Sequence, residues 1–257
     1  MQASKSLRKM KLLIESSGAK VEAGEIAIPE FVTTLKIDVG LSGNAPQSKV
    51  WIDANPNLLV FGFEPLSLHL DMIANRASTW PVRLSPSRIG KNIFLLQAAL
   101  SSKTLSKKQK LKITDMETGS SSLLDSNNLS QSTWEYVPVY KLDDFLDFIN
   151  FTRFRWIEHL KIDAQGMDFE IVKGVKKNLR KICFVTIELD FAYAQSTNSS
   201  RKVTTFLALR GFFKIGRISS YLLRRIFDAV IEVDDPTYFN FRFFKNPYKK
   251  FFIYQKG

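Results

Sequence analysis

The chain has 257 residues, a formal net charge of +12 and 45% hydrophobic residues. That length allows a substantial hydrophobic core in one α/β domain. No uninterrupted apolar run approaches the roughly 20 residues of a membrane span, and the apolar stretch 12–14 is shorter than a signal-peptide core of about 7–15 residues. The one cysteine, Cys183, excludes an internal disulfide. A single cysteine fits a reducing, cytoplasmic location, and its apolar neighbours predict a buried thiol.

Predicted strands and helices alternate along the chain, which indicates an α/β fold with a mostly parallel sheet. We expect an N-terminal helix and lead-in over residues 1–30 and one α/β domain over residues 31–257. Strands are expected near residues 34–39, 58–63, 92–99, 110–115, 136–140, 157–163, 182–189, 211–218 and 249–255. Helices are expected near residues 46–54, 66–77, 142–150, 167–178 and 199–210.

The segment 116–133 is rich in Ser, Asn and Thr, which predicts a loop. A polar lid formed by Ser120, Ser121 and Ser122 could cover or touch a bound acceptor, the molecule on which the protein would act. Ser121 and Ser122 would be the acceptor-binding residues. The alternative is a surface loop without such a role.

The positive charge is spread over the chain, with local clusters at residues 103–112, 173–181, 217–225 and 245–250. Such a surface attracts nucleic acid, an anionic membrane or a phosphorylated substrate, or does no more than keep the protein in solution. The aromatic and basic tail from Phe239 to Phe252 could form a final antiparallel strand pair. It could instead contact a membrane surface or stack on bases.

Three predicted strands end at an acidic residue, namely Asp38, Glu64 and Asp163. The carboxyl ends of strands are where open α/β sheets bind their ligands. Gly40 and Gly43 follow Asp38 and allow close approach of the backbone to a ligand before a helix N-terminus. Glu64 is placed to accept hydrogen bonds from both hydroxyls of a ribose. Together these residues predict a nucleoside site, and the alternative is an Asp turn plus a helix start.

Several other kinds of site lack their sequence signals. The chain has neither the G-x-G-x-x-G fingerprint of dinucleotide binding nor the phosphate-binding loop that ends in G-K-[S/T]. The two histidines, His69 and His159, have no second ligand at metal spacing. We therefore expect no metal site and no serine–histidine triad.

A succession of short motifs resembles the FkbM family of S-adenosylmethionine-dependent methyltransferases. The match covers roughly residues 33–190, and its specificity lies in the order and spacing of the motifs. The motifs are LKIDVG at 35–40, VFGFEP at 60–65, QAALS at 97–101, VPVYKLDDFL at 137–146, LKIDAQGMDFEIVKG at 160–174 and VTIE at 185–188. The resemblance implies a Rossmann-like class I methyltransferase domain, with an antiparallel last strand and helices on both faces.

The resemblance also assigns roles to the residues at the strand ends. Asp38, Gly40 and Gly43 would line the methionyl part of S-adenosyl-L-methionine, Glu64 would bind its ribose, and Gln97 would contact the adenine region. The family usually spaces the first two glycines as D-x-G-x-x-x-G. Here Gly43 comes one residue early and Asn44 holds the usual place. Asn tolerates left-handed backbone conformations better than most residues.

The implied reaction is methyl transfer to an acceptor, which we expect to be a hydroxyl of a sugar, glycan or other small molecule, anionic in the case of a phosphorylated acceptor. Asp163 or Glu188 would accept or orient the hydroxyl proton, with Lys161 beside them. Asp168 and Glu170 are interpreted as acids that start a helix. The alternatives are a ribose 2′-O-methyltransferase of RNA, or a catalytically silent module that binds nucleic acid or a membrane surface.

Overall fold

The computed structural model describes residues 2–75, 82–113, 123, 133–188, 200–215 and 236–243, with side chains from residue 6 onward. The predicted strand over 249–255 and residues Ser120, Ser121 and Ser122 lie outside this part of the chain.

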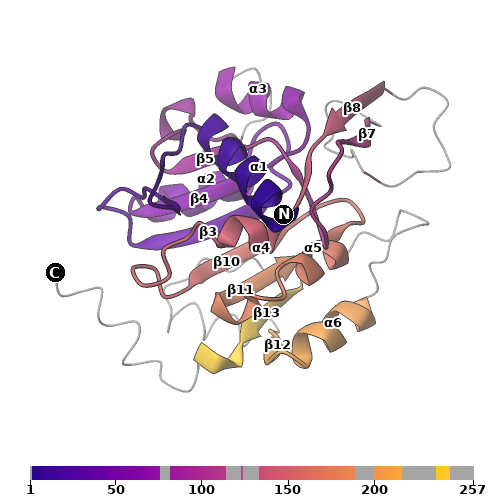
Figure 1. The fold of residues 1–257 in the computed structure, drawn as a ribbon. Helices are drawn as coiled ribbons and strands as arrows, with labels where there is room; N and C mark the ends of the chain where they lie inside the picture. Colours follow the sequence, from indigo (N-terminus) through magenta and orange to yellow (C-terminus); the bar gives the residue numbers. More distant parts are fainter. Residues whose placement is uncertain are drawn as a thin grey trace.

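Seven strands form a central sheet in the order β12-β13-β11-β10-β3-β4-β5 (Figure 1). All neighbours from β11 to β5 are parallel, whereas β13 is antiparallel to both β11 and β12. The mostly parallel sheet was therefore predicted correctly, and residues 237–240 supply an antiparallel strand. The strands are β3 (Thr34–Val39), β4 (Leu58–Phe63), β5 (Ile93–Leu96), β10 (Ile157–Ile162), β11 (Ile182–Ile187), β12 (Phe212–Lys214) and β13 (Thr237–Asn240).

Helices cover both faces of this sheet, as expected. One hydrophobic cluster joins the sheet to α1, α4, α5 and α6, and a second joins it to α2 and α3. All six residues of β4 are buried, because this strand lies between the two layers. The helices are α1 (Gln2–Ser16), α2 (Pro46–Ala54), α3 (Ser67–Asn75), α4 (Leu142–Leu146), α5 (Asp168–Gly174) and α6 (Ser200–Ala208), with short 3-10 turns η1 (Pro86–Arg88), η2 (Leu179–Lys181) and η3 (Phe241–Phe243).

The N-terminal helix is part of the main core. Met10 and Ile14 of α1 are buried in the cluster that contains α4 and α5. Residues 17–33 then form a short hairpin of β1 (Val21–Glu22) and β2 (Glu25–Ile26) and a lead-in to β3. The guanidinium group of Arg153 donates hydrogen bonds to the carbonyl oxygens of Ile28 and Pro29, which fixes this lead-in against the body of the protein.

Two predicted strands are divided in the structure. The expected strand at 92–99 becomes β5 and β6 (Ala99–Ser101), with a turn in which Ala98 N donates to Leu96 O. The expected strand at 136–140 becomes β8 (Thr133–Val137) and β9 (Val139–Lys141), because Pro138 lacks the N–H that a continuous ladder needs. β6 pairs with β9, and β8 pairs with β7 (Gln109–Ile113) in a hairpin that projects from the body (Figure 1).

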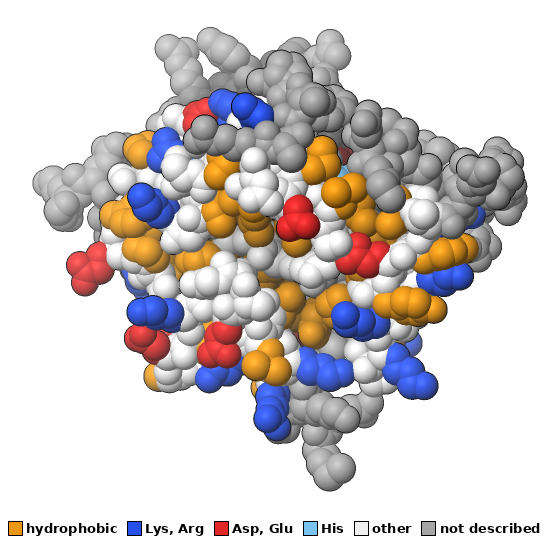
Figure 2. All heavy atoms as spheres, turned by 90° about the horizontal axis from the view of Figure 1, so that it is seen from above, with side chains coloured by type: hydrophobic (Ala, Val, Ile, Leu, Met, Phe, Trp, Pro, Cys, Tyr) orange, Lys and Arg blue, Asp and Glu red, His pale blue; other side chains and the backbone are white. Residues whose placement is uncertain are grey.

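Charged and hydrophobic side chains are mixed over the described surface. In the view from above, lysine and arginine side chains are interspersed with hydrophobic ones (Figure 2). Within the part of the chain that the structure describes, no helix combines the length and the apolarity needed to cross a membrane.

Candidate functional site

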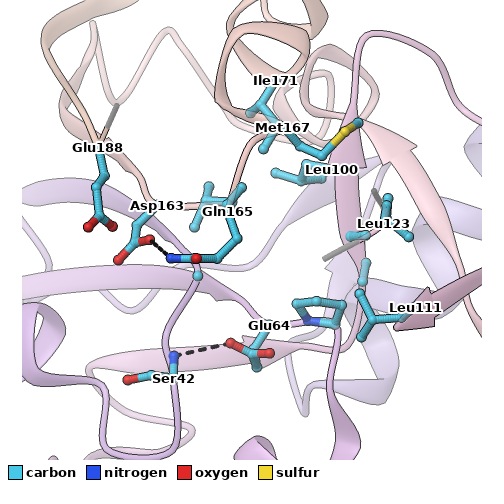
Figure 3. Close-up of a pocket in the computed structure, with 16 residues that line it drawn as sticks. Ser42, Glu64, Leu100, Leu111, Leu123, Asp163, Gln165, Met167, Ile171 and Glu188 are labelled. Carbon is cyan, nitrogen blue, oxygen red and sulfur yellow. Dashed lines mark hydrogen bonds between the residues drawn. The ribbon is translucent and has the colours of Figure 1, made fainter. Parts of the chain in front are cut away.

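A pocket of about 270 Å³ opens at the carboxyl ends of the central strands (Figure 3). Gly40 follows β3, Glu64 follows β4, Asp163 follows β10 and Glu188 follows β11, and all four line the pocket. The volume is close to the lower end of the roughly 300–1,000 Å³ of small-molecule pockets. Parallel strands thus bring together residues that are far apart in sequence, as the strand-end pattern predicted.

Gly40 is required by the close approach of two strand ends. Its φ of +82° is left-handed, and a Cβ atom there would lie 1.8 Å from the carbonyl oxygen of Asp163. Gly40 N donates to Phe63 O, and Asp163 N donates to Val39 O. The backbones after β3, β4 and β10 are therefore locked together where the pocket begins.

The carboxylate of Glu64 is held by two backbone amides. Ser42 N donates to Oε2 at 3.1 Å, and Leu66 N donates to Oε1 at 3.0 Å. His69 Nδ1 lies 3.3 Å from Oε1. Because a carboxylate oxygen has more than one acceptor position, the side chain of Glu64 can still accept hydrogen bonds from a ligand in the pocket.

Asp163 and Glu188 form a carboxyl pair on the opposite side of the pocket (Figure 3). Burial raises the pKa of Asp163, but hydrogen bonds from Glu188, Lys161 and Gln165 outweigh burial, so the pKa lies below its ordinary value. Asp163 is therefore ionised at neutral pH.

Two neighbours fix the Asp163 carboxylate. Lys161 Nζ lies 3.2 Å from Oδ2, and Gln165 Nε2 donates to Oδ1 at 3.2 Å. Gln165 has a left-handed φ of +47°, which is costly for a residue with a side chain. Asp168 stabilises this turn, because its buried carboxylate accepts hydrogen bonds from Ala164 N and Gly166 N.

The remaining wall of the pocket is mostly apolar. Pro65 and Ala98 follow β4 and β5, and Leu111 reaches the pocket from the β7–β8 hairpin. Other lining residues are Val39, Ser42, Ala99, Leu100, Leu123, Ala164, Met167 and Ile171. The pocket thus combines carboxylates on two facing sides with an apolar wall that suits an apolar ring.

Four of the predicted site residues do not line the pocket. Asp38 is buried under α2, where its Oδ2 accepts a hydrogen bond from Ser48 Oγ at 2.6 Å, and burial raises its pKa. Gly43 faces the side chain of Met72 in α3. Gln97 donates to Glu135 at 2.8 Å. Lys161 pairs with the pocket residue Asp163 but does not itself line the pocket.

The loop after β3 keeps its turn in a different way from the expected one. Ser42 and Ala45 hold the left-handed conformations, with φ of +50° and +46°, while Asn44 is not left-handed. The side chain of Asn44 instead accepts a hydrogen bond from Ser42 Oγ and donates one to Val82 O. The shifted glycine spacing is therefore accommodated by Ser42 and Ala45.

Ser121 and Ser122 lie outside the described residues, so their predicted role at the acceptor stays a prediction. The next residue, Leu123, is described and lines the pocket.

The residues interpreted as structural have structural contacts. Cys183 is buried, and burial raises the pKa of its thiol well above the ordinary value. Glu170 accepts hydrogen bonds from Ser102 and Lys173, which ties α5 to the segment after β6. Among the described residues, no group of three His, Cys, Asp or Glu side chains could hold a metal ion.

Sequence reasoning missed Gln165, Ser42 and the apolar wall. Gln165 carried a signal, because it stands next to Gly166 in the turn directly after a strand-end acid. Leu111 carried no such signal, because its place in the pocket depends on where the β7–β8 hairpin lies relative to the strand ends.

The model of the methyltransferase FkbM domain matches residues 48–214, which is more than half of the chain. The match covers Glu64, Asp163 and Glu188 and begins after the loop that contains Gly40. No curated protein and no solved structure matches the chain significantly.

Proposed function

We propose, from the premise that the chain belongs to the FkbM methyltransferase family, that it is an S-adenosylmethionine-dependent O-methyltransferase acting on a hydroxyl of a sugar, glycan or other small molecule. The observation that carries this proposal is the strand-end pocket, in which Glu64 lies across from the Asp163–Glu188 pair. We further propose that residues 31–257 form one Rossmann-like class I domain and that the protein works in the cytoplasm.

The donor set of the pocket fits S-adenosyl-L-methionine. Glu64 would accept hydrogen bonds from the ribose hydroxyls, and the apolar surface of Pro65 and Ala98 would hold the adenine. Gly40, which lines the pocket, would lie beside the methionyl part. The ionised Asp163 would attract the positive charge of the cofactor. Asp38, Gly43 and Gln97 would support this site from outside the pocket.

The cofactor supplies an activated methyl group, and the protein aligns the acceptor and excludes water. Asp163 would accept the hydroxyl proton of the acceptor at Oδ1 or Oδ2. Gln165 and Lys161 would hold that carboxylate in place. Glu188, which lines the pocket with Asp163, would help to orient the acceptor oxygen.

The class of acceptor is proposed from the net charge of the protein. The net charge of +12 favours a phosphorylated, nucleotide-linked or lipid-linked sugar over a cationic one. An RNA acceptor is the second candidate, since a lysine beside an acid can activate a ribose hydroxyl. The residues of that kind in the sequence are Lys161, Asp163, Lys173 and Glu188. RNA is less favoured, because Lys173 pairs with Glu170.

The test is a methyl-transfer screen with labelled cofactor across sugars, nucleotide sugars and short RNAs. Asp163→Asn should lower turnover by roughly 10²–10⁴-fold, the usual contribution of a general base, while the protein stays folded. Cofactor binding is measured separately by calorimetry, so that lost chemistry is distinguished from lost binding. Wild-type turnover in Asp163→Asn would overturn its role as the base.

A further inference from the structure

The outer face of the β7–β8 hairpin carries basic and aromatic side chains that the pocket does not use. Lys110 pairs with Tyr136 across the hairpin, and Trp134 is the cross-strand partner of Lys112, which is itself buried. Side chains alternate along a strand, so Leu111 points the other way, into a hydrophobic cluster and the pocket. Trp134 and Tyr136 are 45% and 62% exposed.

This face continues into a groove of about 340 Å³ beside α1. Lys108 and Pro138 line the groove. They stand two positions from Lys110 and Tyr136 along the chain, and side chains two positions apart on a strand point to the same face. The other lining residues come from α1, the segment 105–107 and β9, namely Lys9, Leu12, Leu13, Ser16, Leu105, Ser106, Lys107 and Tyr140. We call the combined surface of the hairpin face and the groove the lysine–aromatic face.

The lysine–aromatic face is positively charged. It carries Lys9, Lys107, Lys108 and Lys110, and the lining of the groove includes no acidic residue. The hairpin acid Glu135 points away from this face, because its carboxylate accepts hydrogen bonds from Ser67 and Gln97. The face therefore complements an anionic partner.

We propose that the lysine–aromatic face docks on an anionic phospholipid bilayer. Tryptophan, tyrosine and lysine are the residues that lie at membrane–water interfaces. The aliphatic side chains of Leu12 and Leu105 are 59% and 37% exposed beside the lysines, which suits the acyl boundary of a bilayer.

A nucleic acid or a sugar fits this face less well. The ammonium group of Lys110 lies 3.2 Å from the centroid of the Trp134 ring, so it occupies a ring face on which a base or a sugar would stack. Exposed leucines add nothing to phosphate or base recognition. The proposal does not depend on methyl transfer, but docking would hold the hairpin, whose Leu111 lines the pocket, at the bilayer.

The test is co-sedimentation with vesicles of phosphatidylcholine alone and of phosphatidylcholine mixed with phosphatidylglycerol. The protein should bind the anionic vesicles, and added salt should weaken the binding. Each lysine near an anionic surface changes binding roughly fivefold, so the triple variant Lys107→Ala, Lys108→Ala, Lys110→Ala should bind about a hundredfold more weakly. The matched control removes three exposed positive charges elsewhere, at Lys176, Arg201 and Lys202, and should lose much less binding.

A second pair of variants tests the aromatic residues. Trp134→Ala and Tyr136→Ala should each weaken binding to anionic vesicles without lowering the melting temperature, because both side chains are exposed. Equal loss of binding in the triple variant and its control would overturn the proposed face. So would binding of a short RNA but not of anionic vesicles. A failure to detect methyl transfer would not change the expected vesicle binding of the wild type or of these variants.

Discussion

Gln165 combines backbone strain with a contact to the proposed base. A left-handed conformation costs an ordinary residue roughly 1–2 kcal/mol, and such strain gathers at functional sites. The amide of Gln165 donates to Asp163, so the strained turn serves to fix the carboxylate in place.

Gln165→Gly should therefore raise stability and lower activity. Glycine adopts the left-handed conformation freely, so the free energy of unfolding should rise by up to about 1 kcal/mol. Loss of the hydrogen bond to Asp163 should reduce kcat about tenfold or more with a smaller change in cofactor binding. Urea unfolding and methyl-transfer kinetics measure the two effects. A less stable Gln165→Gly protein with unchanged kcat would contradict this account.

At the scale of elements, the pocket depends on three strand ends meeting at Gly40. Gly40→Ala should destabilise the protein by more than about 2 kcal/mol, because the added Cβ would overlap the carbonyl oxygen of Asp163. The matched control is Gly90→Ala, where φ is +75° but no atom lies within 4 Å of the added Cβ. Urea unfolding of both variants separates backbone strain from overlap, and equal losses would refute the proposed overlap.

The sequence predicted the elements best where burial is uniform. β4 and β11 are apolar segments in which all six residues are buried, and α2 begins at Pro46 as a helix start should. Elements outside the central sheet were harder to predict. Pro138, for example, divides a segment whose other residues indicate one continuous strand. The lengths of α4 and α5 were overestimated, because apolar residues continue past their ends.

The site was predictable wherever chain order alone brings residues together. Glu64, Asp163 and Glu188 follow parallel strands, which fixes their common edge. Asp38 is one residue inside its strand, so the alternation of side chains turns it under α2. Gln97 is diverted by Glu135, a partner 38 positions away that no local pattern reveals.

At the scale of the whole molecule, the buried His159 makes stability depend on pH. Burial and the charges of Lys36 and Lys161 lower its pKa well below the ordinary value, so it stays neutral in the folded protein. In the unfolded chain it binds a proton below about pH 6.5. The unfolded state then holds more protons, so stability should fall as the pH drops below this value.

The variant His159→Gln removes that proton linkage. Between about pH 6 and pH 5 the wild-type free energy of unfolding should fall by up to about 1.4 kcal/mol more than that of His159→Gln. Urea denaturation of both proteins at each pH measures the difference, and His69 is common to both. Parallel pH profiles would show that His159 is protonated in the folded state.

The claim on which the whole account rests is that the strand-end pocket binds S-adenosyl-L-methionine. Calorimetric titration of the cofactor tests it most directly, with Glu64→Gln and Gln97→Ala as variants. We expect saturable one-to-one binding by the wild type and binding at least about tenfold weaker in Glu64→Gln. Gln97→Ala should change binding little, because Glu64 lines the pocket whereas Gln97 does not. No binding by folded wild-type protein, or equal binding by Glu64→Gln, would contradict this claim.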